Sequence, residues 1–129
     1  MIIRTITVNG NKIKARVAAT AQEQACGLMY EENLGKDEGM LFEYPSERIL
    51  SFWMKNTKTP LSIAFIDSQG IIKEIRDMKP FSLNSIKSTS PAKWALEVNR
   101  GWFDEHGVVI GDKVNCSAKQ VRIKITFDK

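Results

Sequence analysis

Residues 3–17 read IRTITV, then NG, then NKIKARV, so Asn9-Gly10 separates two runs in which polar and apolar residues alternate. Asn-Gly favours a type I′ turn, because both central residues of that turn need positive φ. The stretch therefore predicts a β-hairpin in which Ile6 faces Ile13 across the strand pair. One face of this hairpin is apolar, and the other carries the basic residues Lys12, Lys14 and Arg16.

Further apolar runs continue the strand pattern from Gly39 onward. They are rich in aromatic and β-branched residues, as is typical of strands, and the four prolines lie between them. The runs cover 40–42, 49–54, 61–66, 71–75, 94–98 and 121–127, with a hairpin connection at 67–70 and a short strand at 108–110 before the turn Gly111-Asp112. We expect an α+β domain of mostly antiparallel strands that form a barrel or a sandwich with two short helices.

The two short helices are predicted at the rim of the sheet. Thr20-Ala21-Gln22-Glu23 has the form of a capping box, so it predicts a helix over about 21–29. Within that helix we expect Cys26 to be a small buried apolar residue. A second helical turn is predicted through His106, with Asn99 as its cap and Gly107 as its C-terminal stop.

Length and composition indicate one globular domain spanning 1–129. The chain has 129 residues, of which 43% are hydrophobic and 26% charged. A chain of this size buries roughly two-thirds of its unfolded surface around a single core. The formal net charge of +4 favours solubility and only weak attraction to polyanions.

The sequence gives no sign of a membrane span, a signal peptide or a zinc site. No stretch approaches about 18 consecutive apolar residues, and residues 1–8 alternate in polarity instead of forming an apolar core. Cys26 and Cys116 lie far apart and the chain has one histidine, which leaves too few ligands for structural zinc. We expect a cytoplasmic protein without a cofactor or metal, or an exported or periplasmic one if a leader was removed.

The most concentrated polar and aromatic block follows the run 49–54. Lys55, Asn56 and Thr57 come directly after Trp53. A strand end beside an aromatic ring is a frequent ligand site, because the sheet aims the side chains and the loop leaves room for a ligand. In the structural alternative, Asn56 and Thr57 bind loop amides and Lys55 pairs with a carboxylate.

Glu97 interrupts the apolar run 94–98. A carboxylate there either faces solvent or is paired inside the protein. If Glu97 points inward, its natural partner is Lys55, and the two groups would transfer protons on a small substrate if their pKa values were shifted toward neutrality. In the structural alternative Glu97 is solvated or forms a scaffold salt bridge.

Two further features have a functional and a structural interpretation. His106 is the one histidine available to a nucleophilic mechanism, yet no serine or cysteine motif accompanies it and a cation suits a helix C-terminus. The basic residues of the hairpin, with Arg122 and Lys124, would form a strip along adjacent strands. These strands offer no aromatic residue for base stacking, so an ordinary solvated face is favoured and no nucleic-acid partner is expected.

Five blocks of the sequence resemble a known family. The blocks are 27–29, 39–42, 52–57, 60–67 and 91–101, of which Phe-Trp-Met-Lys-Asn-Thr is the most specific. In this order and spacing they resemble the domain of unknown function 192 family over about residues 5–115. The resemblance implies a compact β-rich fold with a few short helices, found mostly in bacteria and often exported behind a leader. It implies no activity.

These observations favour a small binding or accessory domain without an assigned activity. Its predicted pocket contains Trp53, Lys55, Asn56, Thr57, Glu97 and Asn99. We expect a small-molecule ligand or a protein partner and no membrane. The alternatives are an enzyme that uses Lys55 and Glu97, and a weak nucleic-acid binder that uses the basic strand face.

Overall fold

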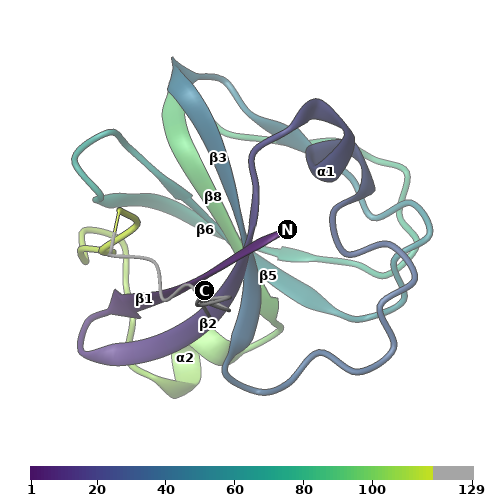
Figure 1. Cartoon of the computed structure of the whole chain (residues 1–129), viewed down its shortest axis with the longest axis horizontal. Helices are drawn as coiled ribbons and strands as arrows, with labels where there is room; N and C mark the ends of the chain where they lie inside the picture. The colour runs from purple at the N-terminus through teal and green to yellow at the C-terminus, as the bar shows by residue number, and fades with distance from the viewer. Residues whose placement is uncertain (118–129) are drawn as a thin grey trace, which may run out of the picture.

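A six-stranded mixed sheet forms the body of the protein in the computed structural model, which describes residues 1–117. In spatial order its strands are β1 (Ile2–Val8), β2 (Asn11–Ala18), β3 (Glu38–Arg48), β8 (Ala92–Asn99), β5 (Leu61–Ile66) and β6 (Ile72–Met78). A small second sheet pairs β4 (Ser51–Phe52) with β7 (Ile86–Lys87), and the helices are α1 (Ala21–Cys26) and α2 (Trp102–Glu105). In Figure 1, β3, β8 and β5 cross the middle of the molecule, and α1 and α2 lie on opposite sides of that crossing.

The sheet is mostly antiparallel, as predicted, but it contains one parallel pair. β2 and β3 run parallel, because α1 and the segment after it return the chain to the end of the sheet where β2 began. Isolated bridges at Val8–Val114 and Ile71–Lys113 place the segment 113–114 against the outer strands. Over residues 1–117 the sheet nevertheless stays open, so the predicted α+β class is confirmed but a closed barrel is not.

The N-terminal hairpin forms with the predicted turn and register. Asn9 and Gly10 have φ values of 48° and 82°, and Ile6 pairs with Ile13. On the polar face Lys12 and Lys14 are exposed, whereas Arg16 forms a 2.8 Å ion pair with Glu31. The predicted strand at 121–127, with Arg122 and Lys124, lies outside the described residues.

The first helix begins as predicted and ends earlier. The Thr20 hydroxyl accepts from the Glu23 amide, and the Glu23 carboxylate accepts from the Thr20 amide, each at 3.1 Å. The helix stops at Cys26, before the predicted residue 29, because Gly27 leaves helical geometry with φ of 51°. The expectation that Cys26 is buried is wrong, since its side chain is exposed.

Several predicted elements in the loops are wrong. Asn99 ends β8 and its side-chain amide donates to the Leu34 and Gly35 carbonyls, so it does not cap α2, which follows Gly101. Only Ser51–Phe52 of the run 49–54 forms a strand, and residues 108–110 form none. Gly107, with φ of 65°, follows the end of α2 as predicted.

Two apolar cores lie on opposite faces of the sheet. Leu41, Leu96 and Val98 belong to the first core, which the hairpin and α2 cover. The second core takes the alternate residues of the same strands and is covered by the loops around β4; its members include Met40, Phe42, Ile63, Ala95, Leu28, Leu50, Phe52 and Met54. Because side chains alternate along a strand, Glu97 projects into this second core with Ala95.

Candidate functional site

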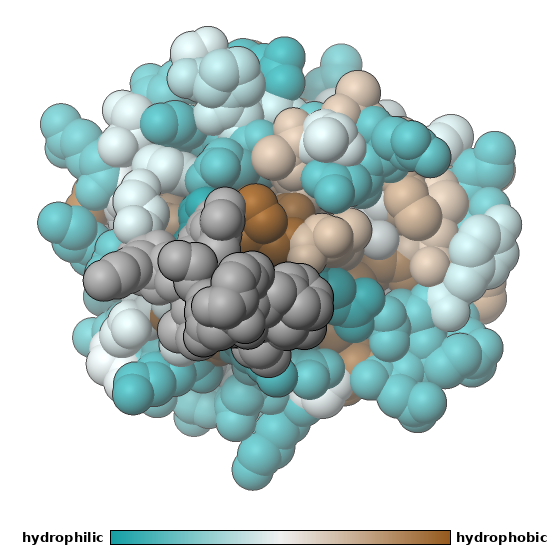
Figure 2. Space-filling model, viewed as in Figure 1, coloured by the Kyte–Doolittle hydropathy of each residue, from teal (hydrophilic) through white to brown (hydrophobic). Residues whose placement is uncertain are grey.

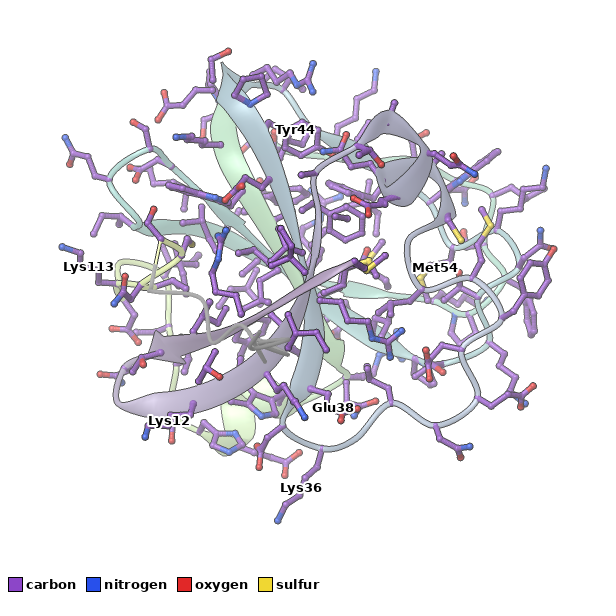
Figure 3. The ribbon with its side chains drawn as sticks, viewed as in Figure 1. Lys12, Lys36, Glu38, Tyr44, Met54 and Lys113 are labelled. Carbon is purple, nitrogen blue, oxygen red and sulfur yellow. The ribbon has the colours of Figure 1, made fainter. Side chains whose placement is uncertain are left out.

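A cavity of about 260 Å³ lies above the second core. Its walls come from α1 and the segment after it, from β3, from the loop that contains β4, and from β8. Four aromatic residues line it, namely Phe42, Tyr44, Phe52 and Trp53. In Figure 3 the labelled Tyr44 and Met54, which both line the cavity, lie on the α1 side of the sheet, whereas Lys12 and Lys36 extend from the opposite end.

Glu97 is the acidic group of this cavity. The residue is 4% exposed, and its backbone pairs with Met40 and Ile63, whose side chains are also buried. Among residues 1–117 the Glu97 carboxyl has no hydrogen-bond or ion-pair partner, and it borders the cavity. Burial raises the pKa of Glu97 to about 8, so the carboxyl is mostly protonated at pH 7.

A glycine sets the backbone beside Glu97. A Cβ atom at Gly39 would lie 2.4 Å from the carbonyl oxygen of Glu97, so a larger residue there would push β3 away from β8. Gly39 therefore permits the close approach of the two strands that hold Glu97 in the floor of the cavity.

The inner aromatic rings of the cavity, Phe42 and Phe52, are buried, whereas the outer ring of Trp53 is exposed to solvent. Phe42 and Phe52 meet edge to face with their centroids 4.8 Å apart. Trp53 is 46% exposed, and the Lys55 ammonium lies 5.2 Å from its ring centroid. Burial raises the pKa of Tyr44, and Glu97 raises it further while Arg48 lowers it, so the phenol lies within electrostatic reach of Glu97. Figure 2 shows apolar surface open around and below the position of α1.

Three neighbouring loops near the cavity have unusual backbone geometry. The Tyr30 amide donates to the Asn56 carbonyl, and the Phe81 amide donates to the Thr57 carbonyl. Tyr30, Asn56 and Phe81 have positive φ values of 63°, 56° and 63°. This conformation is uncommon for bulky residues and tends to cluster at functional sites, where the surrounding structure holds it.

The cavity brings together three of the six predicted site residues. Trp53, Thr57 and Glu97 line it. The Thr57 hydroxyl donates to the Lys55 carbonyl at 3.0 Å, so it bonds within its own loop, although to a carbonyl group and not to an amide as the structural alternative had it. The expected pairing of Lys55 with Glu97 is wrong, because Lys55 is exposed over Trp53 and does not line the cavity.

The other predicted residues lie elsewhere. Asn56 forms the left-handed turn of its loop and does not border the cavity. Asn99 borders a separate cavity of about 180 Å³ with Trp102 and His106. There the His106 ring stacks on Trp102 at 4.0 Å, and His106 Nδ1 lies 2.8 Å from the Trp102 carbonyl oxygen, which fits a structural role. Within residues 1–117 no group of three His, Cys, Asp or Glu side chains is arranged to hold a metal.

Sequence reasoning missed the residues that lie opposite Glu97. Cys26 and Met29 line the cavity from the segment at the end of α1, and Phe42 and Tyr44 line it from β3. Alternation along β3 signals that Phe42 and Tyr44 share a face, but it does not say which strand carries the other side of the cavity. That information depends on the pairing of β3 with β8.

A family model matches residues 4–116, which is almost the whole part of the chain that the structure describes. The chain belongs to the domain of unknown function 192 family. This family, DUF192, is described as Uncharacterized ACR. The match confirms the resemblance of the sequence blocks and carries no activity with it.

Two crystal structures of bacterial proteins share the fold. A protein of unknown function from Novosphingobium aromaticivorans DSM 12444 is 33% identical, with a TM-score of 0.84, and the match covers 88% of this chain and 84% of that one. A protein from Sinorhizobium meliloti 1021 described as a "putative transcription regulator" is 35% identical, with a TM-score of 0.81 and coverage of 88% and 90%. No curated protein matches the chain. Residues 1–117 contain no helix with the length and apolar character needed to cross a bilayer.

Proposed function

We propose that this protein is a non-catalytic binding module that takes a small molecule into the cavity above Glu97. One observation carries the proposal: a buried carboxyl group without a partner among residues 1–117 opens onto a cavity walled by aromatic rings. The Glu97 oxygens face the cavity and are not sealed in the packed core, so a molecule that enters the cavity can contact them. A bound ligand could therefore replace the water that the carboxyl loses on burial.

The chemistry of the walls favours binding over catalysis. Proton transfer by Lys55 and Glu97 would require both groups to face one substrate, and the position of Lys55 over Trp53 argues against this. Within residues 1–117 the walls combine aromatic rings, several polar side chains and one acid, as in sites that bind and orient a ligand. We therefore propose no reaction for this cavity.

Nucleic-acid binding is the weaker alternative, although one relative is described as a transcription regulator. On the hairpin face Arg16 is engaged by Glu31, which leaves Lys12 and Lys14 as the exposed cations of β2. Two lysines on one strand supply little of the phosphate neutralisation that binding needs. A titration with duplex DNA at low ionic strength should therefore show no binding in the micromolar range.

Two residues of the protein can report the binding of a ligand in the cavity. Cys26 is exposed and lines the cavity, and Trp53 lines it as well. We expect at least one member of a panel of neutral, anionic and cationic fragments to slow alkylation of Cys26 by iodoacetamide about tenfold at saturation and to shift the tryptophan fluorescence.

Two matched variants separate cavity binding from surface binding. Ala25→Trp fills the cavity, whereas Ala21→Trp places the same side chain on α1 at an exposed position outside the cavity lining. The first variant should abolish protection of Cys26, and the second should retain it. The proposal fails if no fragment changes either reporter, or if both variants bind equally well.

A further inference from the structure

We infer that the cavity binds an organic cation, namely a small alkylammonium group that pairs with the Glu97 carboxylate while its carbon atoms contact the aromatic walls. This inference rests on the proposed function and adds the chemical class of the ligand. It follows from three features of the cavity, which are its charge, its rings and its isolation from the basic residues of the chain.

The ionisable residues of the lining disfavour an anionic ligand. The protein has a formal net charge of +4, yet within residues 1–117 no Lys, Arg or His lines this cavity. An anion would therefore meet no cationic partner and would face the one acidic group. A cation, in contrast, would pair with Glu97 once its carboxyl gives up a proton, and no ion pair within residues 1–117 already occupies that group.

The aromatic walls suit a weakly hydrated cation. A cation over the face of a tyrosine or tryptophan ring is attracted by the ring quadrupole, and quaternary ammonium groups are recognised in this way. Two of these rings already hold cations in the free protein, with Arg48 4.4 Å from the Tyr44 centroid and Lys55 5.2 Å from the Trp53 centroid. Neither basic residue lines the cavity, so the interior remains available for a ligand cation.

The groups around Glu97 fix the expected pH dependence. Within residues 1–117, Cys26 from α1 and Tyr44 from β3 are the other titratable residues of the lining. The loop after β4 contributes Met54 and Thr57, and the neighbour of Glu97 on β5 is the apolar Ile63. Because the pKa of Glu97 is about 8, a cation must displace a proton when it binds at neutral pH. The affinity should rise close to tenfold per pH unit from pH 6 to 7.5 and become constant above pH 9. A neutral ligand that accepts a hydrogen bond from the protonated carboxyl would instead lose affinity above pH 8.

The direct test compares choline with 3,3-dimethyl-1-butanol, in which carbon replaces the charged nitrogen. We expect isothermal titration calorimetry at pH 8.5 to give at least tenfold tighter binding of choline, or of propylammonium as a primary-amine probe, than of the alcohol. At pH 7, titrations in buffers of different ionisation enthalpy should report the release of nearly one proton. Glu97→Gln should reduce cation affinity at least tenfold.

Two substitutions of Trp53 provide a second test, which does not depend on whether Glu97→Gln folds. Trp53 is half exposed, so Trp53→Leu should fold and lose cation affinity several-fold, whereas Trp53→Phe keeps an aromatic face and should retain most of it. Equal or tighter binding of the alcohol would overturn the inference. If neutral or anionic fragments protect Cys26 but neither cation does, the ligand class is wrong and the binding module survives. If nothing protects Cys26, both proposals fail.

Discussion

Individual side chains in this protein differ sharply in their access to solvent, and the two cysteines show this most clearly. Cys26 is exposed at the end of α1, whereas Cys116 is buried in the first core. Burial raises the pKa of the Cys116 thiol to about 12, which removes the reactive thiolate at neutral pH. The two thiols should therefore behave as one reactive and one inert group.

We predict that Ellman's reagent titrates one thiol rapidly in the native protein and two after denaturation. Cys26→Ser should remove the rapid equivalent and leave the buried one. Equal rates for both thiols at pH 8 would contradict the burial of Cys116.

The sequence identified Glu97 as an unusual residue but did not predict which residues lie around it. The strand pattern shows that Glu97 faces the side of the sheet opposite to Leu96 and Val98, but it leaves open whether that side is solvent or core. In the structure Glu97 points into the second core and, among residues 1–117, has no partner there. Its expected partner, Lys55, does not pair with it, because Lys55 is exposed and its ammonium lies over Trp53. The direction of an exposed lysine side chain depends on the conformation of its loop, which the sequence pattern does not give.

Elements with a local signal were predictable, and elements set by tertiary contacts were not. Asn9-Gly10 and the Thr20-Glu23 capping box are complete within a few residues, so the hairpin and the start of α1 agree with the structure. The run 49–54 has the apolar composition of a strand, but most of it covers the second core as a loop. The parallel pairing of β2 with β3 likewise depends on a long connection and has no local signal.

The capping box should stabilise the short helix α1. Thr20→Ala should lower the free energy of unfolding by about 1 kcal/mol, because the Glu23 amide loses its acceptor at the start of a six-residue helix. Thr20→Ser retains the hydroxyl and should lose much less. Urea denaturation followed by circular dichroism measures both. Equal losses in the two variants would mean that packing of the threonine methyl group, and not the cap, stabilises α1.

For the whole protein, the burial of the Glu97 carboxyl should make the free energy of unfolding depend on pH. The native protein holds the Glu97 carboxyl with a pKa of about 8, whereas the unfolded chain has the ordinary value near 4.5. Between these values the native state binds one more proton than the unfolded state, so stability falls as the pH rises. The contribution of the protonated form is fully present below pH 4.5 and is lost as the pH passes 8.

We therefore predict that the wild type loses stability relative to Glu97→Gln as the pH rises from 5 to 8. The difference in unfolding free energy should change by up to about 1.4 kcal/mol per pH unit and level off above pH 9. Urea denaturation at each pH measures it, and His106 and the other titratable groups cancel because both proteins contain them. Saturating choline should reduce this loss above pH 8, since it stabilises the charged carboxylate in the folded protein. Parallel stability curves for the two proteins would instead mean that water solvates the Glu97 carboxylate in the native state, and the cavity would then lack the desolvated carboxyl that the binding proposal needs.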